Sequence, residues 1–243
     1  MDALALVTGA NRGLGKETAR QLARQGVKVL LGSRDLERGV AAAQELAADG
    51  IRVTPVRLDV TDAACVEDVA DEVERRHGRL DILVNNAGVI AEGPALTVTA
   101  AQLRHIFEVN VFGVVTSIHT FLPLLRRSPA PRIVNVASTT ASLGLTAAGV
   151  ELPGDADRRL AYTSSKAALN MLTVQYARAF GRDPQLARLK INSATPGYTA
   201  TAMNNFRGTR SVELAARVIV ELATLLDDGP TGGFFADDGP VPW

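Results

Sequence analysis

The chain alternates short apolar segments of strand length with longer segments of helical periodicity, and this alternation limits the possible folds more than any other feature. The apolar segments are Leu4–Val7, Val27–Leu31, Val53–Leu58, Ile82–Val84, Ile133–Val136 and Lys190–Ala194. The helical segments are Gly13–Arg24, Leu36–Asp49, Ala63–His77, Ala100–Arg126, Arg159–Phe180 and Val212–Leu226. Strands that helices separate pair in parallel, and right-handed crossovers place helices on both sheet faces. The sequence therefore predicts an α/β fold with a doubly wound parallel sheet, in which ligands bind beyond the carboxyl ends of the strands.

The length and composition fit one domain. With 243 residues, 47% of them hydrophobic, the chain can bury a large core without dividing. We therefore expect residues 1–243 to form a single domain. One segment, Gly144–Arg158, is rich in glycine, proline and acidic residues, which is typical of an exposed inserted loop.

Charge and cysteine content exclude several classes of protein. Lys+Arg and Asp+Glu both number 26 and no basic block occurs, so we expect no nucleic-acid partner. The single cysteine, Cys65, indicates a reducing compartment, and His77, His105 and His119 lack the spacing of a metal site. The N-terminus reads as a strand and not as a signal peptide, and we find no apolar segment long enough to span a bilayer. The sequence thus predicts a cytoplasmic protein with no bound metal and no membrane partner.

The first strand is followed by a turn with three glycines, Gly9, Gly13 and Gly15, ahead of the first helix. Glycines at this spacing let the backbone turn tightly and approach a pyrophosphate, while the amide groups at the helix N-terminus face the anion. Glycine-rich turns also occur in ordinary loops. The place of this one, between the first strand and the first helix, favours a dinucleotide site.

The end of the second strand bears on which dinucleotide binds. A carboxylate there would accept hydrogen bonds from a free ribose hydroxyl and would repel a 2′-phosphate. This chain has the neutral Ser33 and the cationic Arg34, and Arg12 in the glycine turn adds a second cation. These residues favour NADPH over NADH. The alternatives are that both arginines lie on a solvated surface, or that the neighbouring Asp35 binds the ribose.

Tyr162 and Lys166 lie four residues apart in a predicted helix and therefore share one face. A nearby ammonium and a bound cationic nicotinamide both favour the phenolate, so we expect the pKa of Tyr162 to fall toward the working pH. Ser138 ends the fifth predicted strand, where the fold places ligands, and its hydroxyl can bind a substrate carbonyl. Each feature alone is common, because such a pair can lie on a helix surface and such a serine can cap a helix or loop.

Several motifs, taken in order, carry a specific resemblance. They are the glycine turn Thr8–Gly15, the segment Asn85–Gly88, Ser138, the Tyr162–Lys166 segment and Pro196-Gly197. Together they resemble the motif set of the short-chain dehydrogenase/reductase family, over the chain from Leu4 to about Met203. The resemblance implies a Rossmann-type fold and oxidoreductase chemistry that needs no metal.

The resemblance implies a role for each catalytic position. Tyr162 would be the general acid in carbonyl reduction, and Ser138 would polarise the substrate oxygen. Lys166 would hold the nicotinamide ribose and lower the pKa of Tyr162. Asn110, inside the long predicted helix, would keep a water in the proton relay to that lysine. We expect a local bend there, because a buried asparagine within a helix must satisfy its polar atoms.

The resemblance also implies a set of cofactor contacts. Asp59 and Val60 match the pair that meets the adenine, and Asn86–Gly88 matches the turn that shapes the cofactor groove. Thr199 and Thr201 match positions that contact the nicotinamide carboxamide and the phosphates. The positions expected at the cofactor are Gly9, Asn11, Arg12, Gly13, Leu14, Gly15, Ser33, Arg34, Asp59, Val60, Asn86, Ala87, Gly88, Tyr162, Lys166, Pro196, Gly197, Thr199 and Thr201.

Within the family, the segment Met203–Val212 and the ending from Gly232 to Trp243 look most like the carbonyl-reductase branch. That branch often carries an insertion between the catalytic serine and tyrosine, and here these two residues lie 24 positions apart. The insertion precedes the helix that many relatives use to dimerise. We therefore predict that Gly144–Arg158 caps this helix and leaves a monomer, with a homodimer or a homotetramer as the alternatives.

The combined motifs predict an NADPH-dependent oxidoreductase that reduces a ketone or aldehyde to an alcohol. The expected pocket walls, Val89–Leu96, Gly144–Arg158 and Met203–Arg210, favour a medium-sized, largely apolar substrate, while Arg207 and Arg210 would meet an acid group or stay in water. The alternatives are an NAD-linked alcohol dehydrogenase that uses Asp35, a catalytically silent dinucleotide sensor, and a relative that catalyses epimerisation or dehydration.

Overall fold

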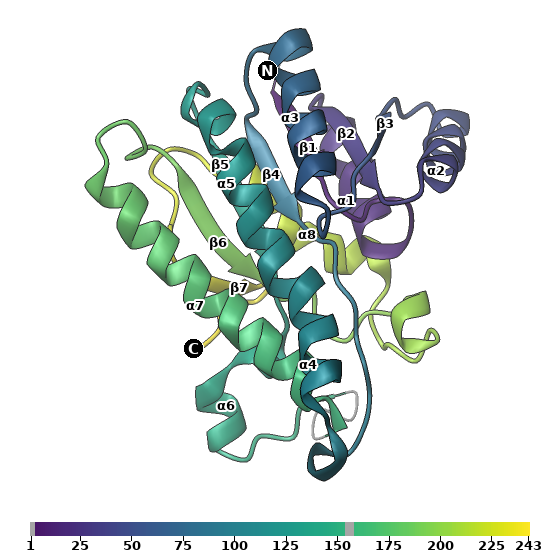
Figure 1. Cartoon of the computed structure of the whole chain (residues 1–243), viewed down its shortest axis with the longest axis vertical. Helices are drawn as coiled ribbons and strands as arrows, with labels where there is room; N and C mark the ends of the chain where they lie inside the picture. Colours follow the sequence, from purple (N-terminus) through teal and green to yellow (C-terminus); the bar gives the residue numbers. More distant parts are fainter. Residues whose placement is uncertain (1–2, 154–157) are drawn as a thin grey trace.

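The computed structural model describes residues 3–153 and 158–243, and within them one eight-stranded sheet runs through the molecule (Figure 1). The strands are β1 Leu4–Val7, β2 Lys28–Ser33, β3 Thr54–Arg57, β4 Ile82–Asn85, β5 Arg132–Val136, β6 Lys190–Ala194, β7 Phe234–Ala236 and β8 Gly239–Pro240. Their order is β3-β2-β1-β4-β5-β6-β7-β8. All neighbours pair in parallel except β8, which is antiparallel to β7. The predicted α/β fold with a doubly wound parallel sheet is confirmed.

Helices cover both faces of this sheet. The helices are α1 Gly13–Arg24, α2 Leu36–Ala48, α3 Ala63–His77, α4 Ala100–Phe107, α5 Gly113–Arg126, α6 Leu143–Ala147, α7 Leu160–Arg182 and α8 Val212–Ala223. Short turns of 3-10 helix are η1 Ala95–Thr97, η3 Thr139–Ala141 and η5 Ala202–Asn204, and a π-helical turn is η2 Glu108–Phe112.

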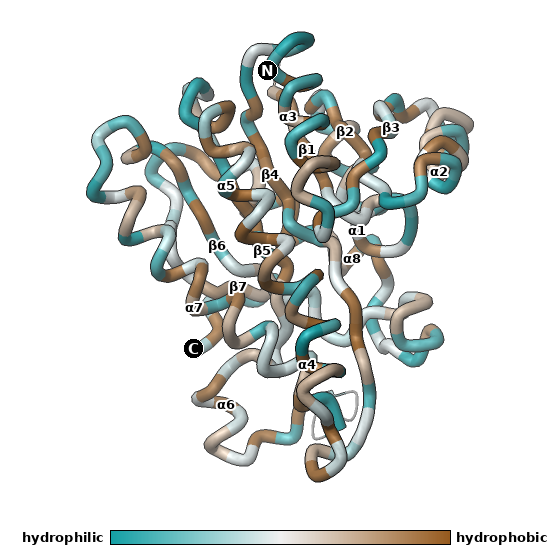
Figure 2. Tube along the Cα trace, in the orientation of Figure 1, coloured by the Kyte–Doolittle hydropathy of each residue, from teal (hydrophilic) through white to brown (hydrophobic). Residues whose placement is uncertain are grey.

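Successive residues of each strand point to opposite faces and so supply two separate cores. In β1, Leu4 and Leu6 pack with residues of α3, α5 and α7, whereas Ala5 and Val7 pack with residues of α1, α2 and α8. Hydropathy follows this arrangement, with apolar colour along the central strands and hydrophilic colour on the outer turns (Figure 2). Because both faces are covered, the carboxyl ends of the strands are the natural place for a site.

The segment Ala100–Arg126, predicted as one helix, is continuous but winds more widely at η2. The irregularity expected at Asn110 is therefore present as a π-helical turn. This run of 27 residues is long and apolar enough to cross a membrane by length and composition, contrary to the expectation that no such segment exists. Half of its most apolar window is buried, and α5 packs against α3 and β4, so the segment is a core helix.

Several other boundaries differ from the prediction. The second strand spans Lys28–Ser33 and not Val27–Leu31, and α6 occupies part of the segment predicted as a loop, Gly144–Arg158. Residues 154–157 of that segment lie outside the described residues. The strands β7 and β8 were not predicted, because elements of three and two residues carry no periodicity.

Candidate active site

The glycine turn lies between β1 and α1 and packs closely against the loop that follows β4. Gly9 and Gly13 have positive φ angles of 63° and 52°. A Cβ atom on Gly9 would lie 2.9 Å from the Cα of Ala87, and one on Gly15 would lie 2.7 Å from the carbonyl oxygen of Gly9 and would collide with the side chain of Asn86. Side chains are therefore excluded at the positions where backbone must approach a ligand.

Thr8 fastens this turn to the loop after β4, a role that the sequence analysis did not assign. Its side-chain oxygen accepts hydrogen bonds from the backbone N–H groups of Asn86 at 3.0 Å and Ala87 at 2.9 Å. In return, Nδ2 of Asn86 donates to the carbonyls of Thr8 at 2.8 Å and Gly9 at 3.1 Å. The position directly before Gly9 was the only signal, and it does not reveal the partners.

No side chain caps the N-terminus of α1. Its N-cap residue is the exposed Arg12, which makes no capping hydrogen bond, whereas the side chains of Asp35 and Asp62 cap α2 and α3. The first amide groups of a helix have no partner within the helix, so α1 leaves donors for an anion. Asn11 lies in the turn itself, and Leu14 packs against the core, so Leu14 contributes backbone to this site.

At the carboxyl end of β2, some polar side chains already have partners and others are free. The buried Ser33 donates from Oγ to the carbonyl of Asp35 at 2.6 Å. The carboxylate of Asp35 accepts from the N–H of Arg38 at 3.2 Å and pairs with its guanidinium at 3.1 Å. The guanidinium groups of Arg34 and Arg12 are exposed and have no polar partner in the described part of the chain. Two cations are therefore free at this edge, and the carboxylate is occupied.

Asp59 and Val60 follow the third strand, at the same end of the sheet. Oδ1 of Asp59 accepts from the N–H of Thr61 at 3.0 Å and from its hydroxyl at 2.7 Å. Val60 packs against the start of α5, where a Cβ on Gly113 would lie 2.7 Å from Cγ2 of Val60. Both residues are thus held in fixed positions beside the carboxyl ends of the strands.

Ser138 and Tyr162 meet at the carboxyl end of β5. Ser138 is the second residue after the strand, and Tyr162 lies in the first turn of α7, where the Ser138 side chain is near enough to lower the pKa of the phenol. Lys166, one turn further along α7, is only 4% exposed. Its Nζ donates to the carbonyl of Val136 at 2.7 Å and lies 5.8 Å from the centroid of the Tyr162 ring. The structure therefore brings the predicted serine, tyrosine and lysine together.

Burial governs the ionisation of both titratable side chains. It raises the pKa of the Tyr162 phenol, while the hydrogen bond from Ser138 and the positive charge of Arg159 act in the opposite direction. Burial also lowers the pKa of Lys166 to about 8. The lowering of the tyrosine pKa that we expected from Lys166 and a cationic nicotinamide stays a prediction for the complex with the dinucleotide.

Asn110 lies fully buried in the π-helical turn and has polar partners on two other segments. Its Oδ1 accepts from the N–H of Val89 at 2.9 Å, and its Nδ2 donates to the carbonyl of Val89 and to the hydroxyl of Ser165, each at 3.0 Å. A Cβ on Gly88 would lie 3.4 Å from Oδ1 of Asn110 and 3.6 Å from Nζ of Lys166. The predicted water relay stays a prediction, and the contact with Ser165 is one that the sequence did not reveal.

The segment after β6 folds back over the glycine turn. Gly197 has a φ of 70°, and the hydroxyl of the buried Thr199 lies 3.2 Å from the carbonyls of both Pro196 and Gly197. The methyl group of Thr201 lies 3.6 Å from the place where a Cβ on Gly13 would be. Thr201 therefore lies beside the glycine turn, and its contact with the phosphates stays a prediction, while Thr199 stabilises its own turn.

One ion-pair cluster, which the sequence analysis missed, joins segments that were expected to form the pocket walls. Glu92, from the loop after β4, pairs with Arg159 at 2.8 Å and with Arg207 at 3.2 Å. Arg210 pairs instead with Asp237 at 2.6 Å. The two arginines considered for binding an acid group, Arg207 and Arg210, thus both have carboxylate partners.

A cavity of about 390 Å³ adjoins the strand ends next to Ser138. It is lined by Thr139, Leu145, Gly197, Arg210 and six residues of the C-terminal segment 236–242. The C-terminal wall was not predicted, because it depends on β7 and β8.

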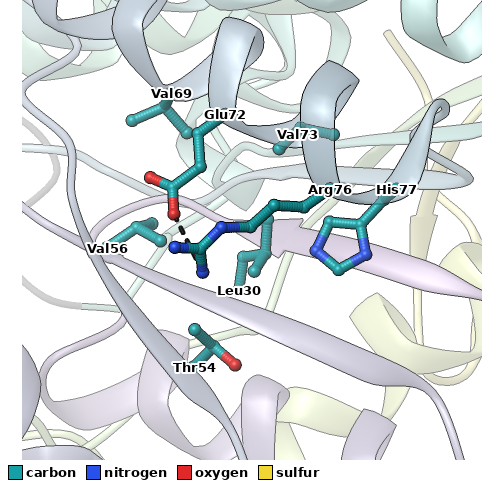
Figure 3. Close-up of a pocket in the computed structure, with 8 residues that line it drawn as sticks. All are labelled: Leu30, Thr54, Val56, Val69, Glu72, Val73, Arg76 and His77. Carbon is teal, nitrogen blue, oxygen red and sulfur yellow. Dashed lines mark ion pairs between the residues drawn. The ribbon is translucent and has the colours of Figure 1, made fainter.

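A smaller cavity of about 110 Å³ lies between β2, β3 and α3 (Figure 3). Its lining residues are Leu30, Thr54, Val56, Val69, Glu72, Val73, Arg76 and His77, and Glu72 pairs with Arg76 at 3.2 Å. None of the motif residues lines it. This cavity is therefore not part of the site.

Comparisons with known proteins agree with the geometry. A sequence profile described as short chain dehydrogenase matches residues 3–211. A short-chain dehydrogenase of Penicillium roqueforti is 37% identical, over 91% of this chain and 88% of the relative. Carbonyl reductase [NADPH] 1 of Sus scrofa is 29% identical, over 99% of this chain and 94% of that protein. The solved structure of salutaridine reductase from Papaver somniferum has a TM-score of 0.83 and 29% identity, and the match covers 97% of this chain and 99% of that one.

The profile spans most of the chain, and the same segment holds the glycine turn and the serine, tyrosine and lysine that the structure brings together. This chain is therefore a member of the short-chain dehydrogenase/reductase family of oxidoreductases.

Proposed function

We propose that the protein is an NADPH-dependent reductase that converts a ketone or an aldehyde to an alcohol, with Tyr162 as the general acid. The observation that carries this proposal is the convergence of Ser138, at the end of β5, with Tyr162 and the buried ammonium of Lys166, both in the first two turns of α7. Two hydroxyl donors at the carboxyl edge of the sheet suit an oxygen that gains negative charge.

Each side chain has a distinct task in this reaction. When bound, NADPH supplies the hydride that the carbonyl carbon receives. Ser138 and Tyr162 hold the carbonyl oxygen, and their hydrogen bonds strengthen as charge develops on it. Tyr162 then transfers its phenolic proton to that oxygen, and the positive charge of Lys166 stabilises the phenolate that remains.

The preference for NADPH rests on the groups after β2. Arg34 and Arg12 are exposed cations, which suit a 2′-phosphate, and the neutral Ser33 does not repel it. An NAD-linked enzyme would need Asp35 to bind the ribose, but both oxygens of this carboxylate are engaged with Arg38. The similarity to a carbonyl reductase named for NADPH adds support.

The surroundings of the site favour a neutral, largely apolar substrate. Arg207 and Arg210, the cations on the nearby loops, are paired with Glu92 and Asp237, so neither stands free for a substrate acid group. Large apolar side chains remain exposed on the expected walls, namely Leu96, Val150, Met203 and Phe206, and Leu143 is exposed directly before one of them. We also propose that the protein acts in the cytoplasm, where its single cysteine, Cys65, stays a free thiol.

The test follows the absorbance of NADPH and, separately, of NADH with a panel of aromatic, aliphatic and quinone carbonyls. We expect consumption of NADPH in strong preference to NADH, and a loss of about 100-fold or more in kcat for Tyr162→Phe, because the proton donor is gone. Tyr176→Phe is the matched control, since Tyr176 lies on the same helix but stacks on Phe180.

Two outcomes contradict the proposal in different ways. Equal use of NADH would favour the NAD-linked alternative. Tight binding of the dinucleotides with no consumption would favour a silent sensor, or a relative that catalyses epimerisation or dehydration.

A further inference from the structure

Arg159 is a buried cation placed directly before the catalytic helix. Its residue is 5% exposed, and its carbonyl accepts the N–H of Thr163 at 2.8 Å, in the first turn of α7. The guanidinium pairs with Glu92 at 2.8 Å, and its Nε is buried with no hydrogen-bond partner among the described residues. Gly93, next to Glu92, forms an isolated parallel β-bridge with Arg159. The Gly93 N–H donates to the carbonyl of Arg158 at 2.8 Å, so the backbones of these two segments are also joined.

Glu92 is the counterion of Arg159, and its negative charge offsets the positive potential of the guanidinium. It also contacts Arg207 at 3.2 Å, so it lies between two guanidinium groups. Arg159 lowers the pKa of the Glu92 carboxyl, chiefly through their hydrogen bond, so Glu92 stays ionised at neutral pH. Removing Arg159 or the charge of Glu92 would therefore change the potential at this end of α7 in opposite directions.

We propose that Arg159 is a positioning residue for the proton-transfer step: held by Glu92 one helical turn before Tyr162, it favours the ionised phenol, and Glu92 sets how strongly. The proposal rests on the proposed function in assigning proton transfer to Tyr162.

Among the described residues, the other charged groups near the start of α7 are exposed or engaged elsewhere, and Arg158, the neighbour of Arg159, is exposed. Lys166 lies on the same helix, and the hydroxyl of Ser138, from the segment after β5, carries no charge. The charged and titratable side chains of the neighbouring helix α4 and its continuation, Arg104, His105 and Glu108, are exposed, so water screens them. In the C-terminal segment, Asp237 is paired with Arg210. Apart from Lys166 itself, Arg159 is therefore the cation near the start of α7 that is shielded from water in the described part of the chain.

The test measures the ionisation of Tyr162 directly. The chain has three tyrosines, so the absorbance change of phenolate formation, taken as the difference from Tyr162→Phe, isolates this group. Uniform labelling with a fluorinated tyrosine brings the titration into a pH range in which the protein stays folded. We expect Arg159→Gln to move the Tyr162 transition to higher pH and Glu92→Gln to move it to lower pH, each by about 0.5 to 1 unit. The alkaline limb of the pH profile of carbonyl reduction should move the same way.

The controls separate a charge effect from a loss of structure. Arg159→Lys keeps the charge and should keep the titration close to that of the unaltered protein. Arg126→Gln and Asp183→Asn remove an exposed ion pair at the other end of α7, 2.9 Å long, and should leave the transition in place. If Arg159→Gln does not fold, Glu92→Gln alone still tests the direction.

The outcomes distinguish this proposal from the proposed function. Shifts of opposite sign support the role of Arg159. Shifts of the same sign, or none, overturn it even when the enzyme reduces carbonyls normally. Opposite shifts in a protein that consumes no dinucleotide would uphold the effect of Arg159 on Tyr162 and refute the reductase.

Discussion

The ammonium group of Lys166 is buried, and burial disfavours its charged form. The side chain is 4% exposed, and its pKa is lowered to about 8 because water does not solvate the ammonium. A group that binds its proton less tightly in the folded state than in the unfolded state destabilises the fold while it is charged. The catalytic lysine is thus held in place at a cost to stability, a balance found at many active sites.

This balance predicts how stability depends on pH. The penalty is fully present below about pH 8 and disappears as the pH rises from about 8 to about 10.5, because the amine is then neutral in both states. Lys166→Met should therefore raise the free energy of unfolding at pH 7, by about 3 kcal/mol at most, while activity is lost. Denaturant unfolding of the dinucleotide-free protein at pH 7 and pH 10 measures this. Lys190→Met is the control, and a less stable Lys166→Met protein at pH 7 would contradict the argument.

Residues of the site were predictable to different degrees. Ser138, Tyr162 and Lys166 could be named from the sequence because they belong to motifs with fixed spacing and a fixed place in the fold. The contact of Glu92 with Arg159 could not, because it joins residues 67 positions apart in segments with no periodicity. It could likewise not be predicted that the side chain of Asp35 caps α2, because the first residue of this helix was not known from the sequence.

At the scale of elements, the π-helical turn places one asparagine against two other segments. The turn rotates Asn110 so that its amide reaches both Val89 and Ser165. Directly after it, Gly113 lets α5 approach Val60, which belongs to the expected adenine site. The helix and the cofactor groove are therefore in direct contact at this glycine.

A single added methyl group tests this contact. A Cβ on Gly113 would lie 2.7 Å from Cγ2 of Val60, so Gly113→Ala should lower the free energy of unfolding by about 1 to 3 kcal/mol and weaken dinucleotide binding. Gly181→Ala is the matched control, because Gly181 lies in a helix with no atom within 4 Å of its added Cβ. That variant should be neutral or slightly more stable, since alanine favours helix over glycine. Thermal unfolding and dinucleotide titration report both effects, and equal behaviour of the two variants would refute the role of Gly113.

Elements were predictable where hydrophobic periodicity was long enough. The central strands and the main helices follow from apolar runs and from helical spacing, because burial on both sheet faces imposes those patterns. The short strand β7 is held by its pairing with β6 and by the buried Phe234, which are tertiary contacts. The C-terminal wall of the cavity therefore could not be predicted.

At the scale of the whole molecule, the inserted segment Gly144–Arg158 bears on the oligomeric state. The segment begins as α6 and leads to Arg159, so it lies beside the start of α7 (Figure 1). We predict that it covers this helix against a second copy and leaves a monomer. Light scattering across a range of protein concentrations should give the mass of one chain. A stable dimer or tetramer would overturn the prediction.

The strand order has a consequence for synthesis on the ribosome. β1 pairs first with β2, β3 then joins β2, and every later strand from β4 to β8 adds to the opposite side in the order in which it is made. No strand has to be inserted between two that are already paired. The sheet can therefore grow outward from β1 as the chain emerges. In each intermediate, only the outermost strands have an unpaired edge.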